Sequence, residues 1–422
     1  MNLQKFSLLD PAVQQCPYSH YEEMRNQQPV FFTEVAGTPI YLISRYSDIL
    51  RILKDHKTFS SRFGGSNMPV SAELAKRITE LRNQMGGYER INTMLAVDPP
   101  EHERYRKLVS RAFTPNAISD LEPMIRGLCC DLIDGFIKKG KCEFVKEFAI
   151  PVPVTVIARA LNVPENRLND FKRWSVDATA GTGTDITDEE RLSAEKGVIE
   201  FQHFFAEQLE IRRKYPKEDI LTNLLTAKID KNEDPNLPDT PLTMPEILGT
   251  LRQILVAGNE TTTKLLTETV RLLAEHPEHW NRLRKNPEVA RPTVEEALRF
   301  TSPTQGMWRI TTKTVEIGDT PIPEGSRIFL LFGSANRDSF VFEDPDIFNP
   351  ERSDTSYHLA FGKGIHYCLG ANLSRLETRV ALEELSRRIS SISLSETNNF
   401  EYHPSFMLRG LTKLDLEFIA TS

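Results

Sequence analysis

The sequence predicts a mainly α-helical protein with a small β-rich region. Apolar residues recur with helical periodicity over most of residues 98 to 300. Two β-rich runs that turn at Ala36-Gly37 predict a hairpin over residues 29 to 46. Strand patterns return over residues 314 to 333 and in the last twenty or so residues. No low-complexity linker divides the chain, so we expect one domain over residues 1–422.

Charge, hydropathy and cysteine usage exclude several classes of protein. The net charge of −7 gives a general nucleic-acid role no electrostatic support. No apolar run is long enough for a membrane span, and the first residues lack the apolar core of a signal peptide. We therefore expect a cytoplasmic protein without a membrane anchor. The five cysteines form no C-x-x-C pair, which argues against a zinc knuckle or a disulfide framework.

One predicted helix is long enough to cross a whole domain. Thr243 and Glu246 form the capping-box pattern that begins a helix, and His276-Pro277 ends it. Near its middle the run AGNETT contains Gly258 and polar residues that weaken a helix interior. Gly258 would let the helix open locally. A local defect in a central helix also indicates a requirement other than stability.

The most specific stretch of the sequence is FGKGIHYCLG, residues 361 to 370, which a helical pattern follows. Its glycines permit positive φ and let the backbone approach a flat ligand closely. Cys368 precedes the expected helix, whose dipole and N-terminal N–H groups stabilise a thiolate. A thiolate ligand donates electron density to haem iron and favours O–O cleavage.

This stretch resembles the cysteine-ligand loop of the cytochromes P-450, F-G-x-G-x-H-x-C-x-G, at every defined position. The resemblance covers nearly the whole chain and implies the cytochrome P-450 fold, with haem b as cofactor. It also implies that Cys368 is the ligand to the iron and that Phe361 and Gly362 contact the cofactor. The run DPPEHERYR resembles the family's D-P-P-x-H-x-x-x-R helix start. The residues expected to bind the haem propionates are then His102, Arg106, Arg309 and His366.

Two further motifs resemble those of the family. Glu296 and Arg299 form E-x-x-R, and Arg352 lies in a segment like the family's arginine-bearing one, which implies a buried structural charge network. The run AGNETT resembles the oxygen-activation motif A-G-x-[DE]-T-T, with glutamate as the acid. It implies that Glu260 and Thr261 are catalytic, because a hydroxyl and a carboxylate together can relay protons to oxygen.

The resemblance implies a monooxygenase with the reaction R–H + O2 + 2e− + 2H+ → R–OH + H2O. We expect a separate ferredoxin with its NAD(P)H-dependent reductase to supply the electrons, because no flavin or iron–sulfur segment is evident. Contacts expected for the ferredoxin are Lys363, Arg104, Lys107 and Arg111. Two alternatives remain open: a peroxide-driven hydroxylase or isomerase, and a non-enzymatic haem sensor. The acid–threonine pair argues against both.

The substrate is expected to be a hydrophobic small molecule such as a terpenoid, steroid, fatty acid or macrocycle, which would be hydroxylated or epoxidised. This expectation rests on the mostly apolar residues at the family's pocket positions, which are Met94, Ile254, Ala257, Thr304, Met307, Met407 and Leu408.

Overall fold

The computed structural model describes residues 3, 6–35, 37–63, 70–110, 113–182, 186–229, 237–238 and 240–421. The chain divides into two compact units. The β-containing unit comprises Met1–Phe59, Ile118–Pro153 and Glu260–Ser422, and the helical unit comprises Ser60–Ala117 and Val154–Asn259. Helices α6 (Pro115–Ser119), α8 (Pro151–Ala160) and α12 (Met244–Glu275) pass from one unit to the other.

The strands form three small sheets, and the largest has the order β1-β2-β8-β5-β3. In the predicted hairpin, Val30 pairs with Ile43, and Gly37 adopts φ +73° beside the turn. The other sheets have the orders β4-β10-β9 and β6-β7. The strands are β1 (Val30–Val35), β2 (Thr38–Ile43), β3 (Phe59–Ser60), β4 (Lys141–Glu143), β5 (Gly306–Thr311), β6 (Val315–Ile317), β7 (Thr320–Ile322), β8 (Arg327–Leu331), β9 (Ile389–Leu394) and β10 (Asp415–Ala420).

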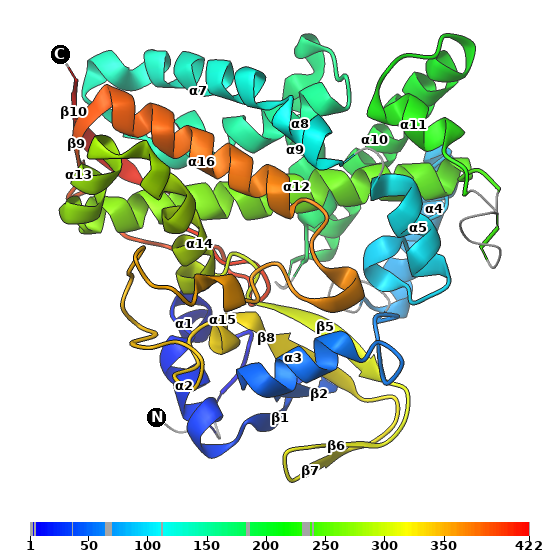
Figure 1. Cartoon of the computed structure of the whole chain (residues 1–422). Helices are drawn as coiled ribbons and strands as arrows, with labels where there is room; N and C mark the ends of the chain where they lie inside the picture. Colours follow the sequence, from blue (N-terminus) through cyan, green and yellow to red (C-terminus); the bar gives the residue numbers. More distant parts are fainter. Residues whose placement is uncertain are drawn as a thin grey trace. The chain divides into compact units, whose positions relative to one another are not determined.

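The large sheet buries apolar residues against a helix of the β-containing unit. Ile43, Ile328 and Leu330 share one core with Ile49 and Ile52 of α3, where apolar residues three apart form one face. The helices of this unit are α1 (Pro11–Gln15), α2 (Tyr18–Gln27), α3 (Tyr46–Lys54), α7 (Glu122–Phe136), α13 (Pro277–Lys285), α14 (Ala290–Thr301), α15 (Phe332–Ala335) and α16 (Ala371–Arg388). Figure 1 shows α7 and α16 side by side, and Arg126 of α7 bonds Glu383 and Glu384 of α16.

The helical unit has an aromatic core. Trp174 and Phe171 of α9 pack on Phe201 and Phe205 of α10. Thr187 and Glu190 cap α10 reciprocally, which satisfies two backbone N–H groups at its start. The helices that lie wholly in this unit are α4 (Ala72–Met85), α5 (Glu101–Ser110), α9 (Leu168–Thr179), α10 (Asp188–Lys214) and α11 (Ile220–Thr226).

Helix α12 is the predicted long helix. Thr243 donates to the Glu246 carboxylate from both its N–H and its hydroxyl, and the helix ends at Glu275, directly before His276-Pro277. The expected opening at Gly258 is not seen, because α12 is helical without interruption. The structure gives Gly258 another role: a Cβ there would lie 2.9 Å from Cδ1 of Ile157, so glycine permits close packing of the helix.

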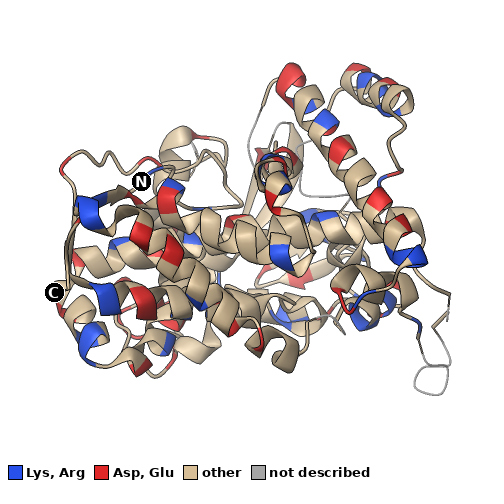
Figure 2. Ribbon diagram, turned by 90° about the horizontal axis from the view of Figure 1, so that it is seen from above, with Lys and Arg blue, Asp and Glu red and all other residues tan. Residues whose placement is uncertain are grey.

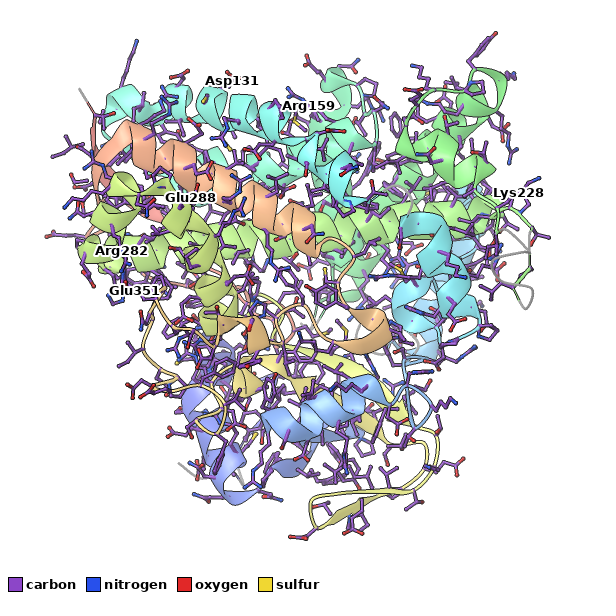
Figure 3. All side chains as sticks on the ribbon, viewed as in Figure 1. Asp131, Arg159, Lys228, Arg282, Glu288 and Glu351 are labelled. Atoms are coloured by element: carbon purple, nitrogen blue, oxygen red, sulfur yellow. The ribbon has the colours of Figure 1, made fainter. Side chains whose placement is uncertain are left out.

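Charged residues of both signs are scattered over the helices in the view of Figure 2. Exposed pairs are common, and Arg282 and Glu351, labelled in Figure 3, form one of them. Among the residues that the structure describes, no helix combines the length and the apolar character that a membrane span needs.

Candidate functional site

The cysteine loop is a tight turn that delivers Cys368 to the start of α16. A short 3₁₀ turn, Gly364–His366, precedes the cysteine, and the Cys368 N–H donates to the Phe361 carbonyl over 2.9 Å. Gly362 and Gly364 have φ of +66° and +74°, which glycine adopts without strain. A Cβ at Gly364 would overlap the carbonyl oxygen of Leu53, so a side chain is excluded there by contact as well.

Three residues that the sequence did not single out hold this loop. Arg375 of α16 lies 4.5 Å from the Phe361 ring centroid and donates to the Tyr367 hydroxyl. Arg375 also binds Glu295 of α14 through two hydrogen bonds of 2.6 and 2.8 Å. Burial alone would raise the pKa of Glu295, but hydrogen bonds from Arg375 and His358 lower it to about 2. The loop is thus tied to α14 by a permanent anion.

The predicted charge network is buried in the β-containing unit. Arg299 donates twice to Glu296, over 2.7 and 2.8 Å, and both side chains are 0% exposed. Arg352 approaches the same carboxylate to 3.0 Å. The remaining donors of Arg299 bind the backbone carbonyls of Asn336, Pro345 and Ile347. The network therefore joins α14 to the segment before the cysteine loop.

The acid of the AGNETT run is engaged by a neighbour on its own helix. Lys264 Nζ lies 2.6 Å from Glu260 Oε2, and the two side chains are 5% and 22% exposed. Burial alone raises the pKa of Glu260, but the charge and the hydrogen bond of Lys264 outweigh it, so the pKa lies below its usual value. The lysine stem fills the space beside Gly410, where a Cβ would overlap it. Thr262, the last residue of the AGNETT run, donates from its hydroxyl to the hydroxyl of Ser374 on α16 over 3.2 Å.

The other predicted residues divide between the two units. His102 and Arg106 lie one turn apart on α5 of the helical unit, where His102 is buried. Ile254 and Ala257 lie on its part of α12, and Met94 begins a 3₁₀ turn, Met94–Ala96. In the β-containing unit, Thr304 pairs with Leu408, and the N–H of Gln305 donates to the Met407 carbonyl. Met307 and Arg309 lie on β5, and His366 lies in the cysteine loop.

The ferredoxin contacts need one correction. Arg104 is 11% exposed and donates to Glu246 over 2.6 Å. Its guanidinium therefore pairs with an acid of the same unit, and Arg104 is not a good candidate for a ferredoxin contact. It also donates to the carbonyls of Thr240 and Pro241. Lys107 is exposed and Lys363 is partly exposed. Arg111 lies outside the described residues.

Comparison with known proteins decides the family. The family described as cytochrome P-450 matches residues 189–409, more than half of the chain. The chain belongs to the cytochrome P-450 family. This P-450 is 33% identical to the biotin biosynthesis cytochrome P-450 of Bacillus subtilis, over 95% of this chain and 96% of that protein. It superposes on cytochrome P-450 CYP109Q5 of Chondromyces apiculatus with a TM-score of 0.85, 36% identity and 99% of both chains covered.

A second solved P-450, CYP109E1 of Bacillus megaterium in complex with corticosterone, has a TM-score of 0.82 and 30% identity, with 96% of this chain and 99% of that chain covered. The fold is therefore the mainly α P-450 fold with its small sheets, as expected. The P-450s bind haem b, and this chain is an enzyme of that class.

The residues of the cysteine loop fit haem b. A Cβ at Gly362 would meet nothing closer than the His366 carbonyl oxygen at 3.9 Å, so the loop leaves room for a flat ligand beside it. Cys368 lies shortly before the N-terminus of α16, with Leu369 and the N-cap Gly370 between them, and proximity to a helix N-terminus favours a thiolate. Arg309 and His366, in the same unit, are the donor types that propionates require.

Proposed function

We propose that this P-450 is a monooxygenase that hydroxylates or epoxidises an apolar small molecule. The observation that carries the proposal is the Glu260–Thr261 pair on α12, in which a carboxylate adjoins a hydroxyl. A haem sensor or carrier has no need of such a pair. We further propose that both units form one catalytic domain, because curated relatives align along nearly the entire chain.

Haem b, when bound through Cys368, supplies the redox chemistry that activates O2. The chain's own residues would have three tasks. Cys368 would provide the thiolate, and His102, Arg106, Arg309 and His366 would neutralise the propionates. The Thr261 hydroxyl would hold a proton donor beside the reacting oxygen. Glu260 would pass protons from solvent to that hydroxyl, which requires its release from Lys264 in each cycle.

The residues proposed to line the substrate pocket are mostly apolar, which suits a terpenoid, steroid, fatty acid or macrocycle. The relative solved with corticosterone supports this size and polarity. A ferredoxin with its NAD(P)H-dependent reductase is the proposed source of electrons. Lys107 and Lys363 remain proposed contacts, since Lys107 is exposed and Lys363 is partly exposed.

Isotope labelling tests the proposed function. The holoprotein would be incubated with a ferredoxin, its reductase, NADPH and a panel of apolar compounds under ¹⁸O2. We expect products that carry one ¹⁸O atom. A product formed only with hydrogen peroxide, and never with NADPH and ferredoxin, would instead identify a peroxide-driven hydroxylase. A protein that binds the compounds but oxidises none under either condition would support the sensor.

A further inference from the structure

Three arginines surround one glutamate in the helical unit. Glu195 of α10 accepts from Nε of Arg82 on α4 over 2.5 Å, and its other oxygen accepts from Arg90, which follows α4. The third arginine, Arg252, extends from α12 and adds its charge to those of Arg82 and Arg90. The Glu195 side chain is 3% exposed, and both of its oxygens are already used.

This arginine cluster, Arg82, Arg90 and Arg252, has two positive charges more than its single acid neutralises. Within the described residues, Arg252 makes no hydrogen bond or ion pair, and Nη2 of Arg82 is buried without a hydrogen-bond partner. Burial and the charge of Arg90 lower the pKa of Arg252 to about 10. A half-buried cation beside like charges costs stability, so its presence indicates a requirement other than folding.

The segment that carries Arg90 is held in place by hydrogen bonds. The Tyr88 N–H donates to Gln202 of α10 over 3.1 Å, and the His203 ring bonds the Gly86 carbonyl over 3.0 Å. The Thr93 hydroxyl donates to Gln253 of α12, the residue after Arg252, over 2.7 Å. The guanidinium groups of Arg82 and Arg90 are therefore held in position before a ligand arrives, because Glu195 and this segment fix them, which lowers the entropic cost of binding.

We propose that Arg82, Arg90 and Arg252 bind the anionic head group, a carboxylate or a phosphate monoester, of a substrate whose remainder is apolar. Guanidinium groups bind both oxyanions through paired, charge-assisted hydrogen bonds. A dianion would neutralise the surplus of the cluster completely. The inference rests on the proposed function, because the apolar remainder of such a substrate is the part that the proposed monooxygenase would oxidise.

An exposed pair on the same two helices provides a matched control. Arg77 of α4 binds Glu189 of α10 over 2.8 Å, with side chains 40% and 77% exposed. There one arginine meets one acid, so no charge remains for a ligand. Arg77→Gln thus removes an arginine from α4 without touching the arginine cluster.

The test compares decanoate, decyl phosphate and 1-decanol as ligands of the holoprotein, by calorimetry and by the haem spin-state shift. We expect the wild-type protein to bind at least one anion about tenfold or more tightly than the alcohol. Arg252→Gln should weaken binding of that anion by about tenfold and leave 1-decanol unchanged, since one charge-assisted contact is lost. Arg77→Gln should bind all three ligands as the wild type does.

The melting temperature of Arg252→Gln separates a ligand site from a structural contact. The melting temperature should equal or exceed that of the wild type without ligand, because the substitution removes a half-buried positive charge that lies beside like charges. A lower melting temperature together with equal weakening of all three ligands would overturn the proposal. So would wild-type protein that binds the alcohol as tightly as both anions. The anion that binds more tightly identifies the head group.

Failure of this inference is distinguishable from failure of the proposed function. Oxidation of 1-decanol without any preference for the anions would leave the monooxygenase in place and refute the anion site. Anion-selective binding that Arg252→Gln abolishes, with no oxidation of any ligand, would establish the site and refute the monooxygenase.

Discussion

Lys264 Nζ lies 2.6 Å from Glu260 Oε2, one turn away on the same helix. The lysine is nearly buried, and its stem occupies the space that Gly410 leaves open. The proposed proton relay therefore starts from an ionised Glu260 carboxylate, and its ion pair with Lys264 must break before it can pass protons. Removal of the lysine should change the stability of the protein, whereas removal of the Thr261 hydroxyl should change the product formed per NADPH. The two variants therefore test different parts of the relay.

Lys264→Met should destabilise the protein by about 2 kcal/mol, because it leaves the Glu260 carboxylate without its charged partner. In the wild type the pKa of Glu260 is lowered, so the pair stabilises the fold above the usual carboxyl pKa of 4.5 and loses this effect as pH falls through the lowered value. In the variant burial dominates and the pKa rises, so the deficit should be largest near about pH 7 and shrink towards about pH 5. Chemical denaturation at several pH values measures this.

The double variant Glu260→Gln, Lys264→Met is the control for that prediction. With both charges absent, most of the lost stability should return, and the pH dependence of the deficit should vanish. A double variant as unstable as Lys264→Met would mean that the lysine acts through packing against Gly410 and not through its charge.

Glu296→Ala should cost about 3–5 kcal/mol and appear mainly as a low yield of holoprotein, because two buried arginines lose their shared anion. The melting temperature and the ratio of haem to protein absorbance measure the effect. The exposed pair of Arg282 and Glu351 supplies the control, since Glu351→Ala should change neither quantity appreciably. Equal behaviour of the two variants would contradict a structural role for Glu296.

Cys368→Ala should abolish the red-shifted absorbance of the reduced CO complex and most haem binding, because the thiolate ligand is removed. Cys16→Ser alters an exposed thiol and should keep the band. The spectrum of the reduced, CO-treated protein decides the matter, and a Cys368→Ala protein that retains the band would exclude this cysteine as the ligand.

Gly364→Ala should lower haem occupancy and stability more than Gly318→Ala does. Both glycines have positive φ, but a Cβ at Gly318 meets nothing within 4 Å, whereas at Gly364 it overlaps the Leu53 carbonyl. Gly318→Ala therefore isolates the backbone strain, about 1 kcal/mol. Equal losses in the two variants, measured by thermal unfolding and haem titration, would show that the overlap with Leu53 is relieved at no cost.

Local patterns carried most of the sequence-based prediction. The hairpin, the long helix and the strands over residues 314 to 333 were predicted correctly, since period and turn residues determine them locally. Partners distant in sequence were missed. Glu295 adjoins a recognised motif, yet its bonds with Arg375 depend on how α14 meets α16. The ion pair of Arg104 and Glu246 was missed for the same reason, because it depends on the packing of α5 against α12.

The most direct test of the proposed relay is the amount of product formed per NADPH consumed, the coupling, in Thr261→Ala. The Thr262→Ala variant is the control. Thr262 donates to Ser374 of α16, so its loss should leave the relay intact. Thr261→Ala should still bind substrate and CO and still consume NADPH, because the thiolate and the charge network are untouched. Product formed per NADPH should fall severalfold while hydrogen peroxide or water forms instead, and added hydrogen peroxide should restore part of the product. Unchanged coupling in Thr261→Ala would contradict the acid–alcohol relay, and a loss confined to Thr262→Ala would transfer the role to that residue.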